Sequence, residues 1–177
     1  NMCHESSGVA LNESIGIGKG TVRLEDFDKA DLIVIVGQNP GTNHPRMLSA
    51  LKSAKKSGAS VLSINPLKET GMRRFRHPQS PIDMLGAGTQ ISDDHVNIKI
   101  NGDMALFRAI GSIILDKGPH DLDFINLNTT GFLDYAKIAQ KIDWDLIEHL
   151  TGQDRERINE ISDYFCRSKR TIVCWAM

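Results

Sequence analysis

The pattern of apolar and polar residues is clearest near the start of the chain, where it predicts two strands around a helix. Residues 31–36 are a run of mostly β-branched apolar side chains, which is typical of a strand buried on both faces. A helical period follows Pro45, and residues 60–64 form a second short apolar run. Residues 31–65 therefore predict a βαβ unit in an α/β fold, a doubly wound and mostly parallel sheet flanked by helices.

The rest of the chain predicts a loop followed by a mainly helical region. Residues 66–90 lose all periodicity and gather Gly, Pro, Arg and His, which predicts a long loop or insertion. A helix beginning at Gly102 is expected to turn five side chains inward: Met104, Phe107, Ile110, Ile113 and Ile114. The other expected elements are an edge strand at 95–100, two or three helices over 121–142 and 153–168, a connection at 144–152, and a final strand from 171.

Composition narrows the class of protein. The chain has 177 residues, 40% of them hydrophobic, with 21 basic against 22 acidic side chains. This is the balance of one soluble globular domain, and it argues against disorder and against a polybasic surface for nucleic acid. There is no apolar run of membrane-spanning length and no signal peptide. Three cysteines fit no disulfide framework, which favours a reducing, cytoplasmic setting. From the charge balance and the lack of a membrane-spanning run, we expect a protein that binds neither membrane nor nucleic acid.

The two ends of the chain suggest a piece of something longer. It begins Asn-Met-Cys-His and ends Cys-Trp-Ala-Met, without a start signal or a polar tail. We therefore expect residues 1–177 to be a single domain excised from a larger subunit.

The first candidate site is the loop after the first strand, residues 37–45. Ligands of open α/β sheets bind outside the carboxyl ends of the strands, where helix N-termini offer N–H groups to anions. Gly37 allows a close backbone approach. The loop matches neither G-x-G-x-x-G nor G-x-x-x-x-G-K-[ST]. The alternative is that Gly37, Asn39 and Pro40 only shape a turn.

Two further loops are expected at the same edge of the sheet. Asn65 and Pro66 follow the second strand, and Gly102 and Asp103 follow a later one. Three loops would then converge on one ligand. The Asp103 carboxylate is able to accept two hydrogen bonds from a guanine edge, and the alternative is that it caps a helix.

The second candidate is the adjacent pair Cys3 and His4. A thiolate suits a soft or redox-active metal, and an imidazole takes up a proton near neutral pH. The alternative is a buried cysteine beside a surface histidine. No zinc-ligand spacing occurs. A basic run at residues 73–77 either holds phosphates or forms a solvated loop tip.

Together these residues resemble the molybdopterin oxidoreductases, and specifically the formate dehydrogenase-like catalytic alpha subunits of the dimethyl sulfoxide reductase superfamily. The resemblance covers essentially the whole chain and rests on the order of its short motifs. These are Met2-Cys3-His4 with Ser6-Ser7-Gly8, Gly37-Gln38-Asn39-Pro40 with His44-Pro45, Asn65-Pro66, Gly102-Asp103-Met104-Ala105-Leu106, and Cys174-Trp175-Ala176-Met177.

The resemblance implies a molybdenum or tungsten ion held by two molybdopterin guanine dinucleotides. It implies that Cys3 is the metal ligand and His4 the proton acceptor in the two-electron oxidation of formate to carbon dioxide. It places Asn65 and Asp103 near the guanosine end of one dinucleotide. In all it assigns eight residues to that dinucleotide: Gly37, Asn39, Thr42, Asn43, Asn65, Lys68, Gly102 and Asp103. The implied partners are a small substrate, formate or another small oxyanion, the rest of the same subunit, and an electron-transfer partner.

The chain departs from the family pattern after the second strand. Many members have Asp-Pro-Arg where this chain has Asn65-Pro66-Leu67-Lys68. A carboxylate and a guanidinium contact would then be either missing or replaced by Lys68. The stretch 72–90 has no counterpart in the better-known formate dehydrogenases. Any 4Fe–4S cluster and the second dinucleotide-binding half would lie outside this chain, so the isolated domain is expected to be inactive. The alternatives are a non-catalytic nucleotide or anion-binding module of a larger complex, and a scaffold domain.

Overall fold

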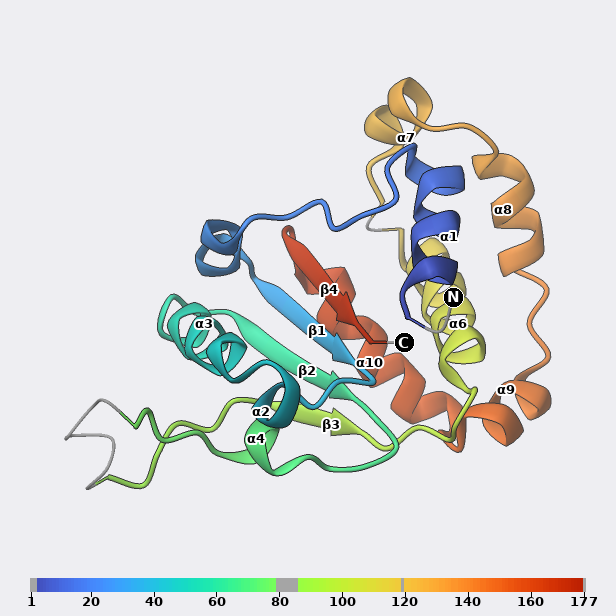
Figure 1. Ribbon diagram of the computed structural model, residues 1–177. Coiled ribbons are helices and arrows are strands. Elements are labelled where there is room, and N and C mark those ends of the chain that lie inside the picture. The colour runs from blue at the N-terminus through green and yellow to red at the C-terminus, as the bar shows by residue number, and fades with distance from the viewer. Residues whose placement is uncertain (1–2, 79–85, 119, 177) are drawn as a thin grey trace. The chain divides into compact units, whose positions relative to one another are not determined.

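The computed structural model describes residues 3–78, 86–118 and 120–176. The chain divides into two compact units (Figure 1). The first, the sheet unit, comprises residues 1–96 and 169–177, and the second, the helical unit, comprises residues 97–168. The assignment of 1–177 to one domain stays a prediction, and each unit is described by itself.

The sheet unit is built on four parallel strands. They are β1 (Leu32–Val36), β2 (Ser60–Ile64), β3 (Asp94–Val96) and β4 (Thr171–Trp175), in the order β3-β2-β1-β4. All five residues of β1 are buried, because the strand lies inside the sheet and has apolar side chains on both faces. The α/β fold with a parallel sheet is therefore confirmed. The expected edge strand at 95–100 is confirmed in place, but it spans only Asp94–Val96.

The predicted βαβ unit is also confirmed. Helix α3 (Pro45–Lys56) connects β1 to β2, with Pro45 in its first turn and two lysines in its last, as helix sterics and the helix dipole favour. Leu48, Leu51 and Ala54 are buried, while Met47 packs half-buried against the same core. This core also takes side chains from β1, β2 and β4, among them Ile33, Val61 and Ile172. Burial of these aliphatic side chains is what holds the unit together.

Short elements complete the sheet unit. They are α1 (Glu5–Ile15), the 3-10 helix η1 (Leu24–Lys29), α2 (Pro40–Asn43) and α4 (Thr70–Arg73). The segment predicted as a loop at 66–90 contains α4 and a bridge between Phe75 and Thr89. Its middle, 79–85, lies outside the described residues.

The helical unit contains α6 (Asp103–Lys117), α7 (Leu122–Asn128), α8 (Phe132–Ala139), α9 (Trp144–Thr151) and α10 (Arg155–Arg167). Each of α7, α9 and α10 begins with an aspartate whose carboxylate accepts a backbone N–H, as N-caps do. The expectation of a mere connection at 144–152 was wrong. A short amphipathic helix fills it because Asp143 caps its start and Gly152, at φ 72°, ends it.

One prediction about α6 was also wrong. Met104 is 84% exposed rather than turned inward. The buried face of α6 is formed by Ala105, Leu106, Ala109 and Ile110, and Met104 lies on the opposite side of the helix at 100° per residue.

In the part of the chain that the structure describes, no helix combines the length and the apolarity needed to cross a membrane.

Candidate functional site at the carboxyl ends of the strands

The strand order places a change of direction between β1 and β4. From β1 the chain passes through α3 to β2 and on to β3 on one side, whereas β4 pairs with β1 on the other side. Such a switch point is where open parallel sheets bind ligands, outside the carboxyl ends of the strands. The loop at 37–45, Asn65 and residues 174–176 therefore lie at the carboxyl ends of neighbouring strands, as the sequence predicted for the first two.

Gly37 makes the turn out of β1 possible. Its φ is +62°, a conformation that costs a residue with a Cβ about 1–2 kcal/mol. Its N–H donates to the carbonyl of Ile64 at 2.9 Å, and the N–H of Ala176 donates to the carbonyl of Val36 at 3.0 Å. The ends of β1, β2 and β4 are thus tied together directly below the loop.

Asn39 shapes the loop with both ends of its amide. Its Oδ1 accepts the N–H of Thr42 at 3.3 Å, which caps α2, and its Nδ2 donates to Glu69 Oε2 at 2.7 Å. The turn-shaping role considered from the sequence is therefore present. Thr42 and Asn43 are exposed on α2, and binding of a dinucleotide by these residues stays a prediction.

Asn65 connects the loops after β1 and β2. It is only 8% exposed. Its Nδ2 donates to the carbonyl of Gln38 at 3.2 Å, its Oδ1 accepts the N–H of Leu67 at 3.4 Å, and its own N–H donates to the carbonyl of Val96 at 3.0 Å. A buried amide with these partners holds the loops after β1 and β2 in a fixed arrangement.

In the sequence, Gln38 is notable only as part of the motif Gly37-Gln38-Asn39-Pro40. Its Oε1 is buried and finds no donor within the described chain. A buried acceptor without a partner costs about 1–3 kcal/mol, so this atom is suited to accept a hydrogen bond from a bound group at the loop.

Cys3 and His4 lie just before α1. Both are exposed, so the alternative of a buried Cys3 is wrong. His4 occupies the N-cap position without using its side chain as a cap. The indole N–H of Trp175 donates to Ser7 Oγ at 3.1 Å, which ties the first turn of α1 to the end of β4.

The other two cysteines are partly buried. Cys174 packs against the core of the sheet unit, and burial raises the pKa of its thiol to about 11. Burial also raises the pKa of Cys166. Since a thiolate is the metal ligand and the nucleophile, these two thiols are poor candidates, and Cys3 differs from them by its exposure.

The metal-ligand chemistry of the chain is sparse. Within residues 3–78, 86–118 and 120–176 no three His, Cys, Asp or Glu side chains come together as a metal site.

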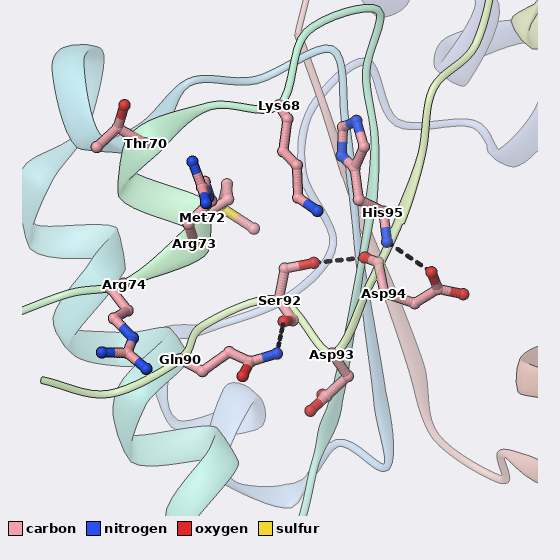
Figure 2. Close-up of a pocket in the computed structure, with 10 residues that line it drawn as sticks. All are labelled: Lys68, Thr70, Met72, Arg73, Arg74, Gln90, Ser92, Asp93, Asp94 and His95. Atoms are coloured by element: carbon pink, nitrogen blue, oxygen red, sulfur yellow. Dashed lines mark hydrogen bonds between the residues drawn. The ribbon is translucent and has the colours of Figure 1, made fainter. Parts of the chain in front are cut away.

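Gly102 and Asp103 belong to the helical unit. Gly102 is the N-cap of α6, and a Cβ there would lie 2.8 Å from the carbonyl oxygen of Leu150 and 2.9 Å from that of Lys99. Asp103 is the first residue of α6 and makes no capping hydrogen bond, so the capping alternative for its carboxylate is wrong. Its contact with guanosine stays a prediction, as does the convergence of three loops. Lys68 lines a pocket beside β3 (Figure 2).

Relatives of the chain include proteins with named activities. An uncharacterized oxidoreductase of Mycobacterium tuberculosis is 44% identical over 183 residues, which covers 100% of this chain and 24% of that protein. Protein YdeP of Escherichia coli is 42% identical, with 100% and 25% covered. Formate dehydrogenase H of Escherichia coli is 26% identical, with 98% and 22% covered. The chain thus spans about a quarter of the length of these relatives.

Two further comparisons define the fold and the family. Acetylene hydratase from Pelobacter acetylenicus superposes with a TM-score of 0.75 at 18% identity, covering 98% of this chain and 21% of that one, which shows a shared fold. A family model described as molybdopterin oxidoreductase matches residues 3–151, most of the chain. The chain therefore belongs to the molybdopterin oxidoreductase family.

Proposed function

We propose that this chain is a cofactor-binding domain of a molybdenum or tungsten oxidoreductase, and that its strand-end loops bind one molybdopterin guanine dinucleotide. The observation that carries the proposal is the switch-point edge, where Gly37 and Asn65 stand at adjacent strand ends. A second dinucleotide would be held by parts of the subunit outside this chain.

The residues present suit such a cofactor. A dinucleotide needs a close backbone approach, and nothing but the Cβ of Ala176, 3.9 Å away, lies within 4 Å of a Cβ built on Gly37. The orphan acceptor Gln38 Oε1 offers a hydrogen-bond partner to a donor on the ligand. By the family resemblance, Asn65 and Asp103 would each contact the guanosine end, and Asn39, Thr42, Asn43, Lys68 and Gly102 would contribute to binding the dinucleotide.

For the reaction we propose formate dehydrogenase-like chemistry, in which formate gives carbon dioxide, one proton and two electrons. When bound, the metal cofactor supplies the acceptor for the two electrons. Cys3 would hold the metal through its thiolate, and His4 would accept the proton on its imidazole. The His4 ring is available for this because it is exposed and does not cap α1.

The choice of formate is supported by likeness alone. Formate dehydrogenase H and a putative formate dehydrogenase of Bacillus subtilis are 26% and 27% identical to this chain. Another small oxyanion would use the same cofactor and the same Cys3. An electron acceptor and any 4Fe–4S cluster would belong to the rest of the protein.

The test uses the full-length protein, made in a host that synthesises the cofactor. We expect molybdenum or tungsten with guanine nucleotide in a ratio of about one to two, and formate-dependent reduction of a dye. Replacing Cys3 by Ala should lower dye reduction on the order of 10²–10³-fold, whereas Cys166→Ala, a matched cysteine control, should leave it unchanged. A protein without metal and nucleotide would contradict the proposal and favour a non-catalytic nucleotide or anion-binding module.

A further inference from the structure

A pocket of about 650 Å³ lies in the sheet unit beside the edge strand β3 (Figure 2). One wall is formed by the loop after β2 and by α4, and the other by the residues that lead into β3. The first wall carries three cations, Lys68, Arg73 and Arg74, and all three are exposed. The question is what neutralises them.

Nothing in the described chain neutralises Lys68 or Arg73. Neither makes an ion pair or a side-chain hydrogen bond, and Arg74 donates only to the backbone carbonyl of Ala87, at 3.3 Å. Elsewhere cations have acidic partners, as Lys117 has in Asp163. Like charges around one space repel each other unless an anion joins them.

The two carboxylates of the pocket are engaged elsewhere. Asp93 is paired with Lys55 and accepts the N–H of Val61 at 2.7 Å. Asp94 accepts the N–H of His95 at 2.7 Å. In Figure 2 the Asp94 carboxylate points away from the space between the lysine and the arginines. The pocket therefore keeps an excess of positive charge.

The wall that carries the cations is anchored to the core. Met72, between Thr70 and the arginines, is 2% exposed, and its carbonyl accepts the N–H of Ser92 at 2.8 Å. Gly71 lies against α2, where a Cβ on it would come within 2.9 Å of the Cα of Gly41. Anchored on both sides, α4 presents Arg73, and Arg74 directly after it, at a defined place rather than on a solvated loop tip.

We infer that this pocket binds a phosphate group. Lysine and arginine side chains are the usual partners of phosphate oxygens in proteins, and three of them line this pocket. The phosphate belongs either to a free phosphorylated compound or to the diphosphate of a bound dinucleotide. For a free phosphorylated compound the inference goes beyond the proposed function, whereas for the diphosphate of the dinucleotide it rests on that function. In neither case does it depend on Cys3 or on a metal.

The test measures binding of inorganic pyrophosphate to the full-length protein by calorimetry, before and after removal of bound nucleotide. We expect binding that weakens with added salt. The double variant Arg73→Gln and Arg74→Gln should weaken it by about tenfold or more. The matched control Arg76→Gln, an exposed arginine of the same segment that does not line the pocket, should change it by less than about twofold.

The two sources of phosphate give different results. If the nucleotide-loaded protein binds pyrophosphate, the site serves a separate phosphorylated ligand. If only the stripped protein binds it, and the double variant also retains less guanine nucleotide, the site takes the diphosphate of the cofactor. Failure of both forms to bind pyrophosphate, or equal binding by the double variant, would overturn the inference. Metal content measured in the same samples reports separately on the proposed function.

Discussion

The strand-end edge and the pocket beside β3 use polar side chains in opposite ways. At the strand ends the amides of Asn39 and Asn65 each hydrogen-bond protein groups through both the nitrogen and the oxygen. In the pocket Lys68 and Arg73 engage nothing in the described chain. The two asparagines therefore hold neighbouring segments together, whereas the two cations add positive charge to the surface.

Polar residues near a site can thus have two different roles, one in stability and one in ligand binding. A side chain whose hydrogen bonds are all satisfied contributes mainly to stability, and its loss is felt by the whole unit. A cation without a partner contributes little to stability, and its loss is felt mainly by a ligand. Stability and binding should therefore respond to different substitutions.

The largest expected loss of stability comes from Gly71→Ala, at the junction of α2 and α4. The new methyl group would come within 2.9 Å of the Cα of Gly41 and within 3.6 Å of Leu48. Backbone atoms cannot give way cheaply, so we expect a cost of about 2–3 kcal/mol in the free energy of unfolding. Chemical denaturation measures it, and Gly20→Ala, with no atom near its Cβ, is the control. Equal stability of the two variants would contradict the close packing of Gly71 in α4 against Gly41 in α2.

A smaller loss is expected for Asn65→Ala. The substitution leaves the carbonyl of Gln38 and the N–H of Leu67 without their side-chain partner, which should cost about 1–2 kcal/mol. Asn43→Ala is the matched control, because Asn43 is exposed and should change stability by less than about 0.5 kcal/mol. If both asparagines behave alike in denaturation, Asn65 does not hold the two loops.

The pocket cations should hardly affect stability at all. Because, among the residues that the structure describes, Arg73 has no partner and Arg74 has only the carbonyl of Ala87, the double change to Gln should shift the free energy of unfolding by less than about 0.5 kcal/mol in either direction. The same denaturation measurement decides this. A large loss would mean that the arginines belong to the fold rather than to a binding surface.

The smallest effect concerns pH and a cation that does have a partner. Arg170 hydrogen-bonds the carboxylate of Asp31 at 2.9 Å and, with the backbone N–H groups of Lys169 and Arg170, holds the pKa of Asp31 below its usual value. The pair therefore adds stability above the usual aspartate pKa and loses it as the pH falls through the lowered one. In Asp31→Asn we expect the free energy of unfolding to fall slightly less steeply as the pH is lowered through the acid range. Arg73→Gln should leave this pH dependence unchanged. An unaltered limb in Asp31→Asn would contradict the role of this pair.

Much of the sheet unit could be predicted from local pattern. The apolar runs at 31–36 and 60–64 and the period of α3 each reflect burial that one segment determines by itself. Helix α1 was missed because it buries no side chain, so its sequence has no apolar stripe. The sequence did contain a signal for α9, an aspartate cap followed nine residues later by glycine, but the helix is too short for a clear period.

The candidate site was predicted only in part, for the same reason. The loops at 37 and 65 follow apolar strands, so topology alone brings them to one edge. The contact of Asn39 with Glu69 joins residues 30 positions apart, and no local pattern indicates it. The pocket beside β3 likewise depends on how α4 packs against 90–95. The arginines at 73 and 74 were its only sign in the sequence.

The most direct test of the central claim, that Cys3 binds the metal, is X-ray absorption at the metal edge of the full-length protein. The wild-type spectrum is compared with that of Cys3→Ser, and Cys174→Ser serves as a matched control. We predict that Cys3→Ser replaces one metal–sulfur contact by oxygen, while Cys174→Ser leaves the sulfur shell unchanged. An identical sulfur shell in Cys3→Ser and the wild type would contradict the account.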